Sequence, residues 1–132
     1  MPASGNSAIR QGIADVILTN IGTNGIAKTY NGTIGATGVA AVTGANTLLA
    51  THTATGAFGV SSATGIDITE ANFANVAASN VSGTPTFVDL CTSAGVCVWR
   101  IRTPADGWIY SGAIVGGQAV TMTTLTIPVG NA

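Results

Sequence analysis

With 132 residues, the chain is long enough to bury a core without metals or disulfides, and we expect a single domain over residues 1–132. It has only four basic side chains, five acidic side chains and one histidine. Catalytic sites need positioned acids, bases or nucleophiles, so this composition argues against an enzyme and against a bound cofactor. The net charge of −1 provides no basic surface for nucleic acid.

The hydrophobicity pattern argues against a membrane protein. A membrane-spanning helix needs about 18 or more apolar residues in a row, and the richest stretch, Val39 to Ala50, is interrupted by glycine and polar residues. Residues 1–22 lack the basic segment followed by a continuous apolar one that marks a secretory signal. We therefore expect a protein that is made in the cytoplasm and used without export.

The first expected element is a helix over about residues 7–21. Asn6 or Ser7 can cap its start, and the glycines at 22 and 25 end it. Polar residues occupy one face of this helix, and apolar residues recur at helical spacing on the other. The apolar residues are Ile9, Ile13, Val16, Ile17 and Ile21. We expect this stripe to pack on the β core or on a neighbouring copy of the chain.

After residue 25 the pattern changes to short strands. The chain contains twenty threonines, whose β-branched side chains favour strands over helices. Ile26 to Tyr30 and Thr33-Ile34 flank Asn31-Gly32, a combination typical of a tight hairpin turn. The glycine-containing stretch over residues 32–44 is expected to form a surface loop.

Further strands are expected at residues 47–53, 57–60 and 66–69, followed by an irregular or short helical connection around Phe73 and Val76. Four consecutive antiparallel strands are then expected at 87–91, 96–102, 108–115 and 119–127. A type I turn is expected at Pro104, and a phase change in the last strand predicts a β-bulge at Thr123-Thr124. These features favour a mainly β fold, an antiparallel β-sandwich or jelly roll over about residues 26–128, with one N-terminal α-helix.

Cys91 and Cys97 are the two cysteines of the chain. The spacing set by Thr92 to Val96 fits neither a CxxC redox pair nor a zinc knuckle. We expect them to be partners across a hairpin or simply small apolar residues. Thiols are expected in the cytoplasm, and a cross-strand disulfide after oxidation is the alternative.

A candidate protein interface lies around the expected turn at Pro104. Counting back from this turn places Arg102 opposite Trp108. The same register places Arg100 opposite Tyr110, on the same face of the hairpin. Guanidinium groups are attracted to aromatic rings, and these residue types dominate interface hot spots. The alternative is a solvent-facing stripe of residues that discourages pairing of the sheet with other strands.

Two further groups of ionisable residues are candidates for a site. His52 lies between Thr51 and Thr53 and is expected on the surface of a strand. Asp67, expected to point outward, and Glu70 offer two carboxylates for calcium, but their spacing matches no dedicated loop motif. No metal site is therefore expected.

Several segments of the chain share a pattern with a known family. They are Asn46 to Thr51, Ala57 to Ser62, Trp99 to Arg102, the turn from Pro104 to Gly107, Ile109 to Gly116 and the closing threonine-rich strand. These segments resemble small virion proteins of tailed bacteriophages. The resemblance covers the greater part of the chain, including an N-terminal helix rich in small residues, although the segments around Asn31 and between the two cysteines depart from it.

The resemblance implies a non-enzymatic capsid decoration, or cement, protein that binds the outer surface of a phage head and stabilises it. Its partners would be the major capsid protein and copies of itself in a dimer or trimer, without direct contact to nucleic acid or membrane. A tail or host-recognition protein, associated with a fibre or spike, is the first alternative. A small carbohydrate-binding module is the second, but the alternation of strand faces prevents Trp99, Trp108 and Tyr110 from sharing one platform.

Overall fold

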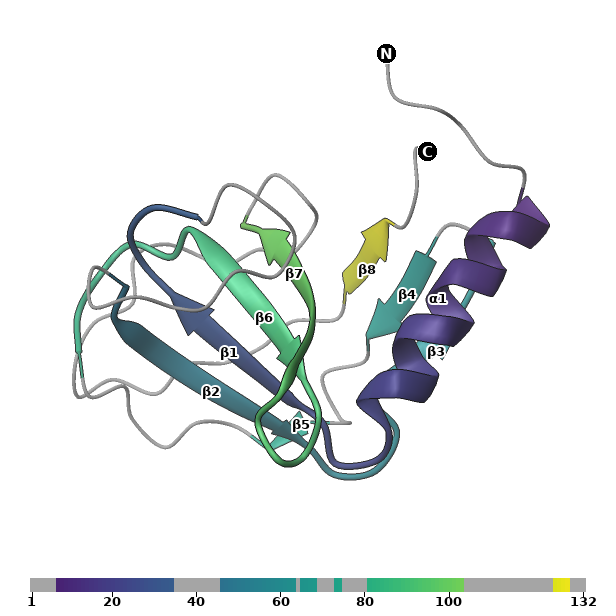
Figure 1. The fold of residues 1–132 in the computed structure, drawn as a ribbon, viewed down its shortest axis with the longest axis horizontal. Helices are drawn as coiled ribbons and strands as arrows, with labels where there is room; N and C mark the ends of the chain where they lie inside the picture. The colour runs from purple at the N-terminus through teal and green to yellow at the C-terminus, as the bar shows by residue number, and fades with distance from the viewer. Residues whose placement is uncertain are drawn as a thin grey trace, which may run out of the picture.

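The computed structural model describes residues 7–34, 46–63, 65–68, 73–74, 81–103 and 125–128. Within these residues the protein is mainly β, with antiparallel sheets and one helix, which confirms the expected class. The elements in chain order are α1 (Ser7–Ile21), β1 (Ile26–Tyr30), β2 (Leu48–Ala54), β3 (Val60–Ser61), β4 (Gly65–Ile68), β5 (Phe73–Ala74), β6 (Phe87–Cys91), β7 (Cys97–Arg102) and β8 (Leu125–Pro128) (Figure 1).

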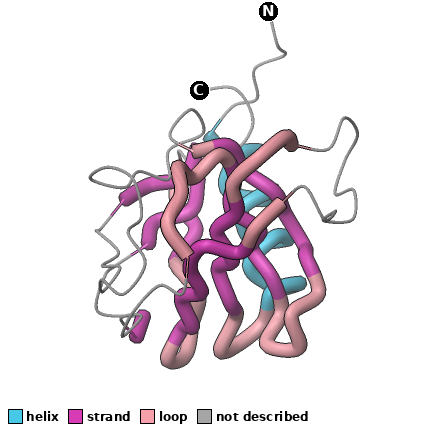
Figure 2. The backbone as a smooth tube through the Cα atoms, turned by 90° about the vertical axis from the view of Figure 1, so that its left-hand side faces the viewer, coloured by secondary structure: helices cyan, strands magenta, loops and turns pink. Residues whose placement is uncertain are grey.

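The described strands form two antiparallel sheets. The larger sheet has the order β5-β2-β1-β6-β7, and the smaller sheet has the order β3-β4-β8. Helix α1 contacts β3 and β4 of the smaller sheet and also β7 of the larger one. Figure 2 views the molecule from the side of the larger sheet, and the helix lies behind its strands. The helix therefore bridges the smaller sheet and β7 at the end of the larger one.

Helix α1 has the bounds that its sequence pattern predicts. Only one side of it is buried, because Ala14, Ile17 and Ile21 face the core. The helix ends at Ile21 and is followed by Gly22, whose φ of 74° lies in the left-handed region and whose N–H donates to the carbonyl of Leu18 at 3.0 Å. This arrangement is the usual glycine cap of a helix C-terminus.

One apolar core joins the helix to both sheets. Its residues are almost fully buried, so each contributes the free energy of removing an aliphatic or aromatic side chain from water. They are Ala14, Ile17, Ile21, Ala27, Ala54, Phe58, Ile66, Ile68, Val88, Leu90, Ile101 and Ile127. Ile66 and Ile68 point inward on β4 while Asp67 is only partly buried, as the alternation in the sequence predicts.

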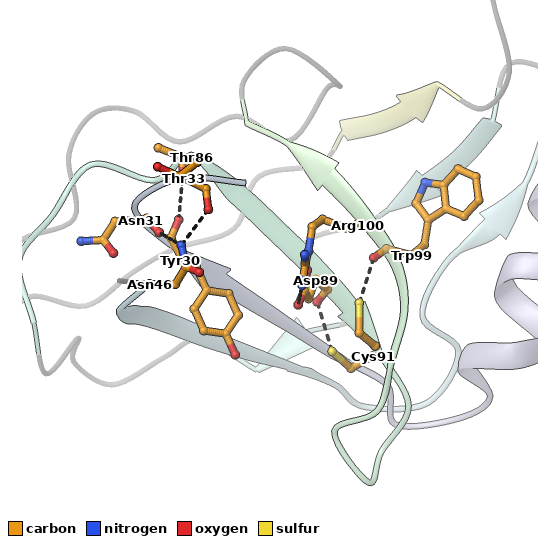
Figure 3. Close-up of polar contacts among 10 residues, drawn as sticks. Tyr30, Asn31, Thr33, Asn46, Thr86, Asp89, Cys91, Trp99 and Arg100 are labelled. Atoms are coloured by element: carbon orange, nitrogen blue, oxygen red, sulfur yellow. Dashed lines mark hydrogen bonds and ion pairs between the residues drawn. The ribbon is translucent and has the colours of Figure 1, made fainter. Parts of the chain in front are cut away.

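The prediction of a tight hairpin at Asn31-Gly32 is wrong. Strand β1 pairs with β2, and Thr33 and Ile34 are not in a strand. The Asn31 side chain instead accepts a hydrogen bond from the Thr47 N–H at 2.7 Å. The Asn46 side chain donates to the Asn31 carbonyl at 2.9 Å (Figure 3). Asparagine amides often bind backbone groups within their own turn, but here the partner is the residue that precedes β2.

The remaining strands agree with the expected ones to different degrees. Phe73–Ala74 is a strand that pairs with Thr53 and Ala54, not an irregular or helical connection. The segment expected as a strand at 57–60 has only Val60 in β3, whereas Ala57 forms an isolated bridge with Thr23. Strand β6 has the expected bounds, and β7 begins one residue later than expected.

The expected elements between residues 104 and 124 lie outside the described residues. These elements are the turn at Pro104, the strand at 108–115, the bulge at Thr123-Thr124 and most of the strand at 119–127. The end of that last strand is described as β8, and it pairs with β4 through Ile127 and Ile66. Strand β8 therefore belongs to the smaller sheet.

Candidate functional site

Of the four candidate interface residues, Arg100 lies inside the protein. Its Nε donates to Asp89 Oδ1 at 2.6 Å, and its Nη2 donates to Asp89 Oδ2 at 3.0 Å (Figure 3). The two side chains are 6% and 4% exposed. The hydrogen bonds to Asp89 raise the pKa of Arg100 above its ordinary value. Arg100 is thus held in a buried, two-point ion pair between neighbouring strands.

Two aromatic rings complete the surroundings of this ion pair. The guanidinium of Arg100 lies over the Phe87 ring at 4.8 Å from its centroid, and the Tyr30 ring stacks on Phe87 at 5.2 Å. Burial, followed by the negative charge of Asp89, raises the pKa of Tyr30 above its ordinary value. The aromatic partner of Arg100 in the described structure is therefore Phe87 on β6.

Arg102 has a different position from Arg100. It pairs in register with Phe87, and its side chain is exposed. Trp108 and Tyr110 lie outside the described residues. Arg102 is therefore the candidate interface residue that the described structure leaves at the surface.

An apolar groove lies between α1 and β7. It has a volume of about 700 Å³, and its lining residues are Ile9, Gly12, Ile13, Val16, Ile17 and Asn20 from the helix and Cys97, Val98 and Trp99 from the strand. Several of these side chains are unusually exposed for their type, including Ile9 at 56%, Val16 at 61% and Trp99 at 37%. Figure 3 shows the Trp99 side chain pointing away from Arg100. Exposed apolar residues gathered in one place mark sites of contact with other molecules.

The sequence contained the signal for this groove. Ile9, Ile13 and Val16 follow one another at helical spacing, and they belong to the stripe that is expected to pack on the β core or on a neighbouring copy of the chain. The structure divides that stripe, because Ile17 and Ile21 are buried while these three side chains are exposed. The sequence alone did not show that Trp99 lines the groove, because this depends on which strand lies beside the helix.

His52 is buried, which contradicts the expected surface position. It pairs with Ala27 in register and is 0% exposed. The alternation along β2 explains this position, because Ala50 and Ala54 are buried on the same face. Two small alanines leave room for an imidazole between them on the inward side of the strand.

No described residues form a metal centre. Asp67 accepts a hydrogen bond from the Ser62 hydroxyl at 3.4 Å, and Glu70 lies outside the described residues. Among the residues that the structure describes, no three His, Cys, Asp or Glu side chains gather closely enough to hold a metal ion. No described helix is long and apolar enough to cross a membrane.

The two cysteines are partners across the hairpin of β6 and β7, as one of the two sequence interpretations predicts. Cys91 is buried and Cys97 is half-buried, and both are free thiols. The Cys91 thiol donates to the backbone carbonyl of Asp89 at 3.5 Å, and the Cys97 thiol donates to the backbone carbonyl of Trp99 at 3.7 Å.

Comparisons with known proteins add no relative: no family model, no curated protein and no solved structure matches this chain. Functional inference therefore starts from the chemistry of the groove, the buried ion pair and the cysteine pair.

Proposed function

We propose that this protein is a non-enzymatic virion structural protein, a capsid decoration protein that binds the outer surface of a tailed-phage head and stabilises it. The observation that carries the proposal is the exposed apolar groove between α1 and β7, which suits association with another protein surface. The small number of charged residues and the resemblance of the sequence to small virion proteins support it.

The proposed mechanism is associative. Apolar residues of a capsid subunit would cover Ile9, Val16 and Trp99 and remove their exposed area from water. Copies of the protein placed across boundaries between capsid subunits would reinforce those boundaries, and an oligomer would gain avidity from several contacts. The proposal includes the finer architecture, a β-sandwich or jelly roll in which the two sheets enclose one core.

The first test is the copy number of the chain in purified virions, measured by quantitative mass spectrometry relative to the major capsid protein. A decoration protein is expected in numbers comparable to the major capsid protein. Numbers comparable to tail components would instead favour the alternative of a tail or host-recognition protein. Absence from the particle would exclude both.

A second test addresses the groove itself. Val16→Ser removes an apolar side chain from the groove, and Val60→Ser removes one of equal exposure elsewhere, since the two valines are 61% and 63% exposed and Val60 does not line the groove. We expect Val16→Ser to weaken binding to heads that lack the protein by about tenfold, whereas Val60→Ser leaves it unchanged. Equal binding by both variants would show that the groove is not the contact surface.

A further inference from the structure

A β-bulge brings the two cysteines opposite each other. Strands β6 and β7 pair through Leu90 and Trp99, and a regular ladder would next place Val98 opposite Cys91. The register shifts after Leu90, so that Cys97 is the partner of Cys91 instead. One extra residue on β7 therefore places a thiol opposite a thiol.

The hydrogen bonds of the hairpin show which kind of pair the cysteines form. The N–H of Thr92 donates to the carbonyl of Val96 at 2.9 Å, and the Val96 N–H donates back to the Thr92 hydroxyl at 3.3 Å, so hydrogen bonds join these two residues across the hairpin. The next pair along the ladder, Cys91 and Cys97, is then a non-hydrogen-bonded pair, in which Cα atoms are about 4.5 Å apart and side chains are closest. A disulfide needs Cα atoms about 4.4 to 6.8 Å apart, a range that includes the usual spacing of such a pair.

The surroundings give the two sulfurs different roles. A hydrogen bond with the Cys97 thiol lowers the pKa of Cys91, and the positive charge of Lys28 also acts in this direction, so Cys91 is the better nucleophile for the second, resolving step. The same hydrogen bond raises the pKa of Cys97, so the first attack on an oxidant is the slower step. Cys97 is half-buried while Cys91 is 1% exposed, so an oxidant in solution reaches Cys97 first.

We infer that Cys91 and Cys97 form a dithiol site that a small-molecule disulfide, such as glutathione disulfide, oxidises to an intrachain disulfide. Cys97, after losing its proton to solvent, attacks one sulfur of glutathione disulfide and releases one glutathione thiolate. The Cys91 thiolate then attacks the Cys97 sulfur of the mixed disulfide and releases the second glutathione. Two protein thiols are oxidised to one disulfide, and one glutathione disulfide is reduced to two glutathione molecules, which take up the two protons.

This site goes beyond the proposed function and has a structural consequence for it. Cys97, Val98 and Trp99 form the strand side of the groove. A bond from Cys97 to Cys91 would fix the bulged end of β7 to β6, where hydrogen bonds and packing alone now hold it. Oxidation would therefore make this wall of the groove more rigid without altering the helix side.

The test is intact mass and peptide mapping of the native protein after incubation with excess glutathione disulfide. Wild type is expected to lose two hydrogen atoms per chain, with a linkage that maps to Cys91 and Cys97. In Cys91→Ser the second step is impossible, so the chain should stop at the glutathione adduct of Cys97. We expect this adduct to be at least about tenfold more abundant in Cys91→Ser than in wild type, because Cys91 resolves it quickly.

Two controls make the result decisive. The double variant Cys91→Ser/Cys97→Ser should keep its mass, and wild type in denaturant should form more adduct and less intrachain disulfide, because the bulged register is lost. The proposal is overturned if native wild type stays reduced, stops at glutathione adducts, or forms only disulfide-linked dimers. The wild-type measurement decides this even if a serine variant does not fold.

Discussion

The two sides of β6 are buried to the same degree but occupied by different chemistry. Val88 and Leu90 face the apolar core and are 0% exposed. Phe87, Asp89 and Cys91 point to the other side and are 1 to 3% exposed, and Asp89 binds Arg100 there. Burial alone therefore does not describe what stabilises this strand.

The difference lies in how each side depends on its partners. Apolar packing weakens in proportion to the area and volume removed, so one truncation leaves the remaining contacts in place. A buried charge depends on one specific partner, because its desolvation is offset only while the partner is present. The polar side of β6 should be the more sensitive to a single change and the easier to replace as a whole.

The largest effect is expected when the ion pair is broken. Asp89→Ala leaves the Arg100 guanidinium buried without its carboxylate, and we expect the free energy of unfolding to fall by about 3–5 kcal/mol. Chemical denaturation measures this change. The double variant Asp89→Leu/Arg100→Met should recover most of the loss, because it removes both charges. A double variant as unstable as Asp89→Ala would show that the cost comes from packing rather than from the unpaired charge.

The matching change on the apolar side is Leu90→Ala. This substitution leaves a cavity in the core, and we expect a loss of about 2–5 kcal/mol in the free energy of unfolding. Leu90→Met, which conserves volume, should cost less than about 1.5 kcal/mol and serves as the control. If the two substitutions cost the same, the site depends on the shape of leucine and not on filled volume.

Local patterns predicted much of what lies near these residues. Helical spacing and the glycines that follow predicted α1 at residues 7–21, and a compact apolar run predicted β6 at residues 87–91. The hairpin relation of Cys91 and Cys97 followed from their short separation. Each of these depends on residues close in the sequence, where propensity and turn chemistry act directly.

The choice between possible partners and faces accounts for what the sequence did not reveal. The expected register was counted from the turn at Pro104, so Arg100 was assigned to Tyr110, which lies outside the described residues, and its ion pair with Asp89 across the β6–β7 hairpin was not predicted. Asn31 was assigned to a local turn because the short sequence Asn-Gly is common there, whereas its amide binds residue 47. The burial of His52 depended on which face of β2 meets the core, a choice that alternation alone leaves open.

A pair of glycine substitutions tests how closely the core side is covered. A Cβ at Gly25 would meet the Ile21 side chain, Phe58 at 2.9 Å and the Cys91 carbonyl at 3.0 Å, whereas a Cβ at Gly12 would meet nothing within 4 Å. We expect Gly25→Ala to lower the free energy of unfolding by about 1–3 kcal/mol through overpacking. Gly12→Ala should raise it by about 1 kcal/mol, because alanine favours the helix. Thermal melts of both variants check the opposite signs.

The smallest expected effect concerns the polar side at high pH. The fold raises the pKa of Tyr30 above 10.0, its ordinary value, by burial and by the charge of Asp89. The folded protein therefore holds the phenol proton more tightly than the unfolded chain does. This contribution to stability is fully present below pH 10 and is lost as the pH rises through the folded pKa. In Tyr110→Phe, tyrosinate absorbance should titrate with a midpoint above 10, and Tyr30→Phe should lose the corresponding decline in stability. A midpoint at or below 10 would mean that water reaches the Tyr30 hydroxyl freely. The buried part of the polar side of β6 would then extend to Phe87 but not to the Tyr30 ring stacked on it.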